Sequence, residues 1–272
     1  MDEQELKKRL QAAFNAVANG YDNPALRFFP ESAKHLPQFL KLKGDEHVLD
    51  IATGTGHAAI ALAAALPKGR VTGIDFSEGM LSRAKAKIDE NGIRNISLHS
   101  MDMQSLDFPD SAFDAAVFSF SIFFVEDMEL QLRHVAEKVK LGGKVLATSF
   151  YSGTFSPQVD IFFERVKKYG VDVPSVWRRL STTEECSTLF EKAGLSNIRV
   201  ATKDIGYYLA DAGQWWDIVW NAGLRRFVSG LSPEDLEKFK KEHLQEVAGL
   251  STDKGIWLEV KVLYAIGTKS RT

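Results

Sequence analysis

The stretch Val48-Leu49-Asp50-Ile51-Ala52-Thr53-Gly54-Thr55-Gly56-His57 decides the fold of this chain. An apolar strand leads into an acid and a glycine-rich turn, and a helix is expected to open in the alanine-rich segment 58–63. Glycines at positions 54 and 56 let the backbone approach a ligand where a side chain would obstruct it. A strand, a glycine-rich turn and a helix in this order predict a ligand site at the edge of an α/β sheet.

The acid at position 50 distinguishes two kinds of ligand. Gly54-x-Gly56-x-x-Ala59 fits a dinucleotide fingerprint, and Asp75 follows about 20 residues later, where that fingerprint needs an acid. A carboxylate at the mouth of the turn repels pyrophosphate, because like charges interact strongly in a low-dielectric cleft. It suits a ligand that carries an amino group and a sulfonium. The sequence therefore favours S-adenosylmethionine, with a nicotinamide dinucleotide as the alternative.

The rest of the first half repeats the same strand-and-helix rhythm. Further strands are expected at 70–77, 96–103, 113–120 and 144–149. The alternation predicts a parallel sheet with helices on both faces. Right-handed crossovers bring the carboxyl ends of parallel strands to one edge, outside which ligands bind. We expect four strand-end residues to meet there: Asp50, Asp75, Asp102 and Ser119.

Over about residues 12–205 and the final strand, the chain resembles the class I S-adenosylmethionine-dependent methyltransferases. It is most similar to the small-molecule branch that includes the ubiquinone and menaquinone C-methyltransferases. The segment 14–22 looks like that branch's N-terminal segment, in which a tyrosine, here Tyr21, folds over the cofactor. The chain departs from the commoner motif at Ala52, where glycine is usual, and at His57, where the quinone enzymes carry an acid.

The resemblance implies an α/β fold with a Rossmann-like, doubly wound, seven-stranded sheet whose last strand is antiparallel. Asp75 can accept both ribose hydroxyls, Asp102 the adenine amino group, and the Ser119 carbonyl the methionine amino group. Helix or turn capping remains the alternative for Asp50 and Asp102, and a core hydroxyl for Ser119. The expected cofactor-binding residues are Tyr21, Asp50, Ala52, Thr53, Gly54, Gly56, Asp75, Phe76, Met80, Asp102, Met103 and Ser119.

Segments outside the sheet are expected to form a helical lid. Apolar residues at helical spacing between Leu6 and Val17 predict an amphipathic N-terminal helix. An insertion of roughly fifty residues before the last strand is longer than usual connections, and Ser232-Pro233 predicts a helix start within it. The expected domains are an N-terminal lid segment at 1–30, a methyltransferase core at 31–205 and 256–272, and a helical insertion at 206–255.

The insertion carries Trp215, Trp216 and Trp220 in a pattern that predicts one helical stripe from residue 216 to residue 227. Such aromatic residues can form a packed core, or they can wall a substrate pocket beside the strand ends. Together with Phe123 and Phe124, which follow the fourth strand, they are the expected substrate contacts. We expect them to form an apolar roof that excludes water.

Methyl transfer from a sulfonium asks little of catalytic side chains, because the leaving group is already activated. An in-line displacement needs the acceptor held close to the methyl group, and a base matters only if the acceptor must lose a proton. Tyr21 and His57 are weak candidates for that base. We therefore expect a methyltransferase for a small, apolar or aromatic metabolite. The alternatives are a nicotinamide-dependent oxidoreductase and a non-catalytic S-adenosylmethionine-binding regulatory protein.

Composition limits the partners. The 272 residues carry a formal net charge of −2, without the basic stripe of a nucleic-acid-binding surface. Cys186 is the one cysteine, and neither a signal peptide nor a metal-ligand spacing is visible. Apolar runs stay well short of the ~20 residues that span a bilayer. We expect a cytoplasmic enzyme with a small-molecule acceptor, without a metal, a nucleic acid partner or stable membrane insertion, and a homodimer remains open.

Overall fold

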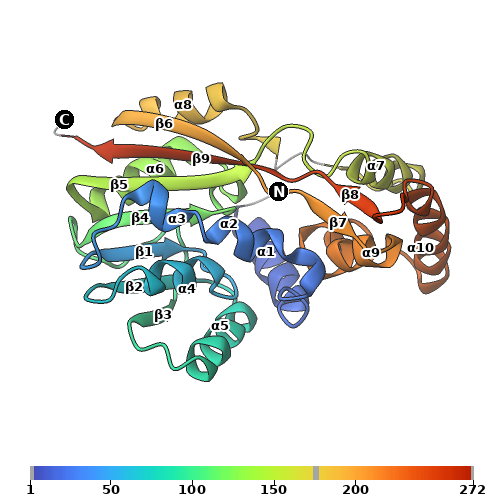
Figure 1. Ribbon diagram of the computed structural model, residues 1–272, viewed down its shortest axis with the longest axis horizontal. Helices are drawn as coiled ribbons and strands as arrows, with labels where there is room; N and C mark the ends of the chain where they lie inside the picture. The colour runs from blue at the N-terminus through green and yellow to red at the C-terminus, as the bar shows by residue number, and fades with distance from the viewer. Residues whose placement is uncertain (1–2, 174–177, 271–272) are drawn as a thin grey trace. The chain divides into compact units, whose positions relative to one another are not determined.

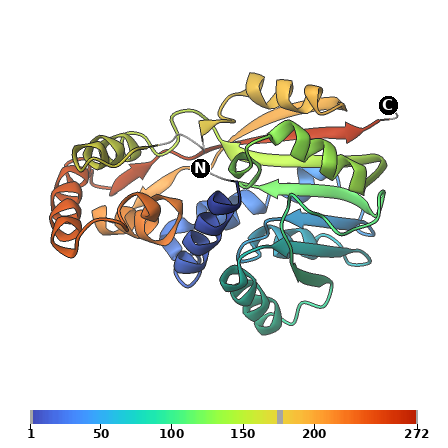
Figure 2. The ribbon, with the colours of Figure 1, turned by 180° about the vertical axis from the view of Figure 1, so that it is seen from behind.

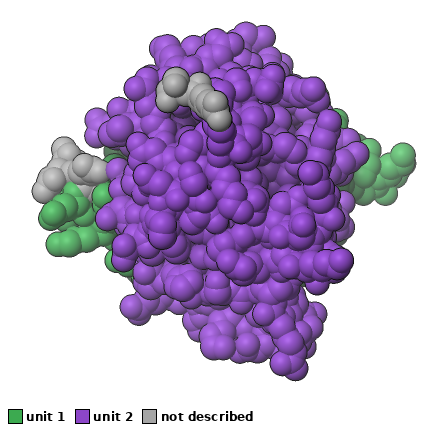
Figure 3. Space-filling model, turned by 90° about the vertical axis from the view of Figure 1, so that its left-hand side faces the viewer, with its two compact units in different colours: residues 1–28, 153–175, 204–261 green, residues 29–152, 176–203, 262–272 purple. Residues whose placement is uncertain are grey.

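The computed structural model describes residues 3–173 and 178–270, and the chain divides into two compact units (Figure 3). Unit 1 is built from residues 1–28, 153–175 and 204–261. Unit 2 is built from residues 29–152, 176–203 and 262–272. Along the part of the chain that is described, no helix is both long enough and apolar enough to cross a membrane.

Unit 2 contains a seven-stranded sheet in the order β3-β2-β1-β4-β5-β9-β6 (Figure 1; Figure 2 shows it from behind). Its strands are β1 (His47–Ile51), β2 (Arg70–Asp75), β3 (Ile96–Ser100), β4 (Phe113–Ser119), β5 (Val139–Phe150), β6 (Leu195–Asp204) and β9 (Lys261–Lys269). Strands β1 to β5 pair in parallel, and β9 pairs antiparallel with β5. The predicted doubly wound sheet with an antiparallel last strand is confirmed. Its order reverses between β1 and β4, the place where such sheets bind ligands.

Helices α2 (Phe28–Ala33) and α3 (Leu36–Leu40) precede the first strand. The helices between strands are α4 (His57–Ala64), α5 (Glu78–Glu90), α6 (Met128–Lys138) and α8 (Thr183–Lys192). Ser77 and Thr182 cap the starts of α5 and α8. The Ser77 hydroxyl accepts the Met80 amide, and Thr182 forms a reciprocal capping box with Glu185. Helix α4 packs on β1 and β2, and α6 packs on β4 and β5.

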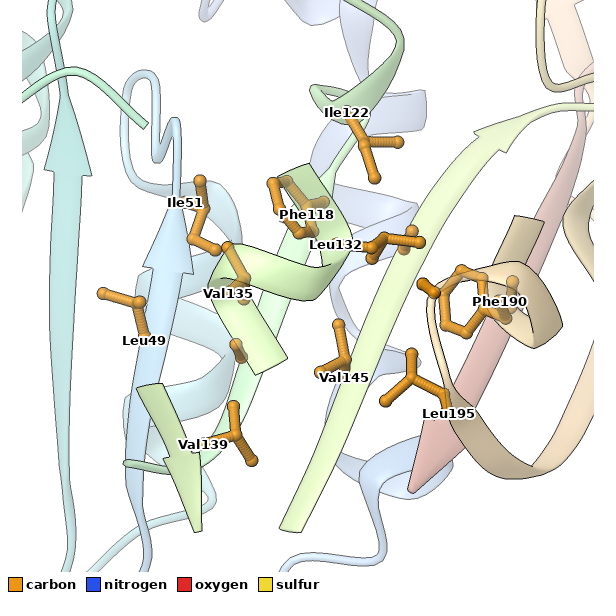
Figure 4. Packing of buried hydrophobic residues seen from close by; sticks show 14 of the residues in the cluster. Leu49, Ile51, Phe118, Ile122, Leu132, Val135, Val139, Val145, Phe190 and Leu195 are labelled. Carbon is orange, nitrogen blue, oxygen red and sulfur yellow. The ribbon is translucent and has the colours of Figure 1, made fainter. Parts of the chain in front are cut away.

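The core of unit 2 is centred on β4, which is buried on both faces. Its Phe118 is fully buried, as are Leu49 of β1 and Val145 of β5 (Figure 4). Val135 of α6 and Phe190 of α8 belong to the same apolar cluster. A continuous apolar run in β4 is what a central parallel strand requires. The buried core fixes the position of the residues at the carboxyl end of this strand.

Unit 1 is mainly helical. It contains α1 (Glu3–Val17), α7 (Gln158–Lys168), α9 (Ala212–Asn221), α10 (Pro233–Ala248) and the two-stranded pair β7 (Tyr207–Leu209) and β8 (Ile256–Leu258). The N-terminal segment and the insertion thus fall in one unit, and residues 153–175, placed in the core by the sequence, join them. The helix start predicted at Ser232-Pro233 is confirmed, because Ser232 caps α10.

The single helical stripe predicted from residue 216 to residue 227 is wrong. Helix α9 ends at Asn221, and Ala222 adopts an extended conformation before a short 3-10 helix at Gly223–Phe227. Glycine is a poor helix former, and a break at this point separates the tryptophans from Phe227. Trp215 is fully buried, and its indole N–H donates to His243 of α10 over 2.7 Å. Trp215 therefore belongs to the packed core of unit 1.

Candidate functional site

Three neighbouring strands bring Asp50, Asp75 and Ser119 to one edge of the unit 2 sheet. In the register of β1 and β2, Asp50 lies opposite Gly73 and Ile51 opposite Ile74. In the register of β1 and β4, Ile51 lies opposite Phe118, one residue before Ser119. Asp75 is the last residue of β2 and Ser119 the last of β4. The carboxyl ends of β2, β1 and β4 thus form one continuous rim.

The glycine-rich turn after β1 is held in left-handed backbone conformations. Ala52, Gly54 and Gly56 have φ values of 55°, 57° and 85°. Nothing lies within 4 Å of the point where a Cβ on Gly54 would stand, so a ligand can approach the backbone there. At Gly56 a Cβ would come within 3.2 Å of the Ala84 Cβ on α5. Ala52 carries backbone strain of about 1 kcal/mol, which is typical of functional sites.

Asp50 is the most unusual acid of the rim, because it is fully buried. Its Oδ2 accepts the Thr53 hydroxyl over 2.5 Å, whereas its Oδ1 has no hydrogen-bond partner among the residues that the structure describes. Burial raises the pKa of Asp50 to about 7, against the lowering effect of the Thr53 hydroxyl, and the Asp75 charge adds to the rise. Gly73 makes room for Thr53, since a Cβ there would lie 3.1 Å from its hydroxyl oxygen.

Asp75 fixes the geometry of two loops. Its Oδ2 accepts the Gly54 amide and its Oδ1 the Ser77 amide, both over 2.8 Å. Burial raises the pKa of Asp75, although the surrounding backbone amides act against this rise. A carboxylate has about four acceptor positions, so two amide bonds leave room for two further donors such as a pair of hydroxyls. The sequence did not indicate this structural role of Asp75 in joining the loops.

The third acid lies outside its strand. The sequence placed Asp102 at the end of a strand over 96–103, but β3 ends at Ser100, so this boundary is wrong. Asp102 Oδ1 accepts the Gln104 amide over 2.9 Å in a tight turn, as the capping alternative anticipated. Met103 is half-buried against the unit 2 core. Both residues are half-buried and stay predictions for the adenine end of a cofactor.

A residue that the sequence analysis missed follows Ser119. Phe120 has a left-handed φ of 55°, which is rare for an aromatic residue. Its amide donates to the Thr148 hydroxyl over 3.0 Å, and the next side chain, Ser121, donates to the Ile51 carbonyl over 3.0 Å. The chain therefore turns sharply at the end of β4. Nothing in the sequence marks this turn, since glycine is the usual residue for such a conformation.

The other predicted site residues are spread over both units. In unit 2, Phe76 and His57 are half-buried next to β2 and at the first position of α4, and Met80 is buried in α5. Phe123 is buried and Phe124 half-buried in the 3-10 helix Ile122–Phe124. Tyr21 and the tryptophans Trp215, Trp216 and Trp220 belong to unit 1. Their roles toward a ligand stay predictions.

Comparison with known proteins identifies the fold and the chemistry. Residues 48–143 match the family model described as "Methyltransferase domain". Aklanonic acid methyltransferase DauC from Streptomyces sp. (strain C5) is 29% identical over 220 residues, which are 76% of this chain and all of that protein. Demethylmenaquinone methyltransferase from Bacillus cereus (strain AH187) is 28% identical over 217 residues, 73% of this chain and 92% of that protein.

These similarities support an S-adenosylmethionine-dependent methyltransferase. The crystal structure of the YcgJ protein from Bacillus subtilis has the same fold, with a TM-score of 0.61 and 21% identity over 89% of this chain and 99% of that one. The resemblance to the quinone branch of the methyltransferases is confirmed at the level of sequence.

The rim of the unit 2 sheet fits this cofactor. The buried Oδ1 of Asp50, which has no hydrogen-bond partner among the described residues, can accept a hydrogen bond from a cationic group of the cofactor. The Gly54 backbone has open space beside it, so the cofactor can contact it directly. Within the described ranges, no group of three or more histidine, cysteine or acidic residues is placed to hold a metal ion.

Proposed function

We propose that this methyltransferase transfers a methyl group from S-adenosylmethionine to a small, planar, largely apolar acceptor by in-line displacement. The observation that carries the proposal is the division of the rim of unit 2. Acids lie at the ends of β1 and β2 and in the turn after β3, whereas aromatic side chains follow β4 and end β5. One half suits a polar cation and the other a flat apolar molecule.

The acidic half would hold the cofactor. Asp50 would receive the methionine amino group, Asp75 the ribose hydroxyls through its two remaining acceptor positions, and Asp102 the adenine amino group. The burial of Asp50 and the open backbone at Gly54 support this assignment. When bound, the cofactor supplies a methyl group on a positively charged sulfur, which is an activated leaving group.

The aromatic half would hold the acceptor. Phe123 and Phe124 lie in the turn after β4 with ring centroids 4.9 Å apart. The three tryptophans belong to unit 1, where Trp215 and Trp216 fill the core, and they are left out of this assignment. One relative is named for a quinone, demethylmenaquinone, and another for a carboxylic acid, aklanonic acid. A flat acceptor with an acidic oxygen or an electron-rich carbon combines these features.

Such an acceptor needs no protein base, and the two hydroxyl groups next to the turn after β4 are engaged with the backbone. The Ser121 hydroxyl donates to a backbone carbonyl, and the Thr148 hydroxyl accepts a backbone amide. A hydroquinone or enol ionises more readily than an alcohol and can present its own nucleophile. The protein's contribution is then to position the acceptor and to exclude water, which is worth about 7–11 kcal/mol in favourable cases.

Methyl transfer to a small panel of acceptors tests the proposal. Purified protein would be incubated with methyl-labelled S-adenosylmethionine and a 1,4-dihydroxynaphthalene, a linear aliphatic alcohol or a short RNA. We expect label in the dihydroxynaphthalene alone. Label in the aliphatic alcohol or the RNA, with none in the aromatic acceptor, would contradict the proposed acceptor class.

A further inference from the structure

Three other parts of the chain form hydrogen bonds with the turn after β4, which comprises residues 120–126. The Phe120 amide is bound by Thr148 of β5, and the Ser121 hydroxyl binds the Ile51 carbonyl of β1. The third of these parts carries Arg179, which precedes α8 and lies 54 residues beyond Val125. Its guanidinium group donates to backbone carbonyls between residues 123 and 126.

The hydrogen bonds to Thr148 and Ile51 fix the backbone at Phe120, whose ring packs against two other aromatic rings. The Phe120 ring stacks on Phe150, the last residue of β5, with centroids 4.5 Å apart and planes inclined by 24°. Phe29 meets the Phe120 ring edge-on at 5.5 Å. Since Phe120 is a non-glycine residue in a left-handed conformation, these contacts must outweigh the backbone strain. Such over-determined strain is typical of sites where position matters.

The Arg179 side chain donates to three backbone carbonyls of the turn. Its Nη1 donates to the Val125 carbonyl over 2.6 Å and to the Phe123 carbonyl over 3.4 Å, and its Nη2 donates to the Glu126 carbonyl. A planar guanidinium group with five donors can serve several carbonyls at once, whereas an ammonium group acts as a point charge. The contact therefore depends on arginine and not on a positive charge alone.

The residues that follow Arg179 are anchored in unit 2 by burial and hydrogen bonds. Its neighbour Leu180 is buried in the unit 2 core. Ser181 accepts the Ser152 amide through its carbonyl over 2.9 Å, and its own amide donates to the Glu185 carboxylate over 2.7 Å. The capping box of Thr182 and Glu185 continues this support into α8. Arg179 thus links the turn after β4 to a fixed point of the same unit.

We propose that Arg179 is a positioning residue for the methyl acceptor: it holds the turn that carries Phe123 and Phe124 in the conformation that receives a flat substrate. This inference rests on the proposed function. Arg179 contacts only the backbone of the turn, and so its effect on the acceptor passes through the two phenylalanines. Asp50 and Asp75, on β1 and β2, make none of these contacts, so the cofactor half of the rim should be unaffected.

The test compares Arg179→Met and Arg179→Lys with a matched control, Arg133→Met. Arg133 is also an exposed arginine of unit 2, and it donates to the Lys192 carbonyl and to Glu129, away from the rim. Three quantities are measured for each variant: the affinity for S-adenosylhomocysteine, the hydrogen-exchange rates of amides 122–126, and kcat and KM for a 1,4-dihydroxynaphthalene. Turnover is repeated with added ethylguanidinium.

For Arg179→Met we expect exchange of these amides to rise about tenfold or more. We expect kcat/KM for the acceptor to fall about tenfold or more, with partial rescue by ethylguanidinium. The affinity for S-adenosylhomocysteine should stay within about twofold of wild type, because Arg179 bonds to residues 123, 125 and 126 and not to Asp50 or Asp75. Arg179→Lys should be intermediate, and Arg133→Met should match the wild type in all three measurements.

Two results would overturn the inference. Unchanged exchange of amides 122–126 in Arg179→Met would show that the arginine does not fix the turn. Faster exchange with unchanged kcat/KM would show that the turn does not position the acceptor. Failure of the proposed function itself is distinguishable, because the wild-type protein would then leave the dihydroxynaphthalene unmethylated, while exchange is measured without any acceptor.

Discussion

Replacing Asp50 with asparagine should stabilise the ligand-free protein while weakening cofactor binding. Burial raises the pKa of Asp50 from 3.8 to about 7. The folded protein therefore binds a proton at Asp50 that the unfolded chain releases, and the free energy of unfolding falls as pH rises from about 4 to about 7. At 1.36 kcal/mol for each pKa unit, ionised Asp50 costs the folded state about 4 kcal/mol above pH 7. An uncharged asparagine avoids that pH-dependent cost.

Urea unfolding of the wild-type protein and Asp50→Asn at pH 5 and pH 8 measures this difference. Asparagine can still accept the Thr53 hydroxyl, so the contact at Oδ2 is retained. Between the two pH values, the stability of the variant should rise relative to wild type by about 2.5 kcal/mol. The exposed Asp89→Asn, on α5, controls for the loss of one acidic charge.

A difference that is the same at pH 5 and pH 8 would refute the reasoning. It would mean that the folded protein solvates Asp50 well enough to keep its carboxyl ionised. The affinity of Asp50→Asn for S-adenosylmethionine should fall about tenfold or more, because a charge-assisted hydrogen bond to the ammonium group is lost. Undiminished affinity would remove Asp50 from the proposed cofactor site.

Three further substitutions test other parts of the account. Asp75→Ala removes the acceptor of two backbone amides, so it should lower the free energy of unfolding by about 1–3 kcal/mol and also abolish cofactor binding. An unchanged free energy of unfolding in urea would contradict the role of Asp75 in joining the two loops. Ala52→Gly relieves a left-handed alanine and should raise stability by up to about 1 kcal/mol, whereas a loss in urea unfolding would argue against strain at this position. Burial, with the charge of Arg165, lowers the pKa of His243 to about 4, so the free energy of unfolding of the wild type should fall as pH drops from 6.5 to 4. His243→Gln should reduce that fall by about 3 kcal/mol. An equal loss of stability in acid for both proteins would exclude His243 as the cause of the loss.

The sequence predicted the sheet and the places of its acids well, because those features are local. The residues of each apolar run, the acid that follows it and the helix start at Ser232-Pro233 each lie within a few positions of one another in the sequence. The position of the last strand between β5 and β6 was implied by the family resemblance, and it is confirmed.

The features that the sequence missed depend on contacts between distant residues. Asp75 meets Gly54 across 21 residues, and Arg179 meets Val125 across 54. The sharp turn at Phe120 is imposed by hydrogen bonds from β1 and β5 against the ordinary preference of phenylalanine. The sequence left open whether the tryptophans form a core or a pocket wall for the same reason. The hydrogen-bond partner of Trp215 is His243 in α10, which lies 28 residues further along the chain.

Calorimetric titration of the wild-type protein at pH 6.5, in two buffers of different ionisation enthalpy, tests the central claim most directly. We predict that S-adenosylmethionine binds at one site and releases a proton, because a cationic ligand favours the ionised form of buried Asp50. NADH should give no binding heat. Binding of NADH in place of S-adenosylmethionine, or S-adenosylmethionine binding without any buffer dependence, would contradict the account.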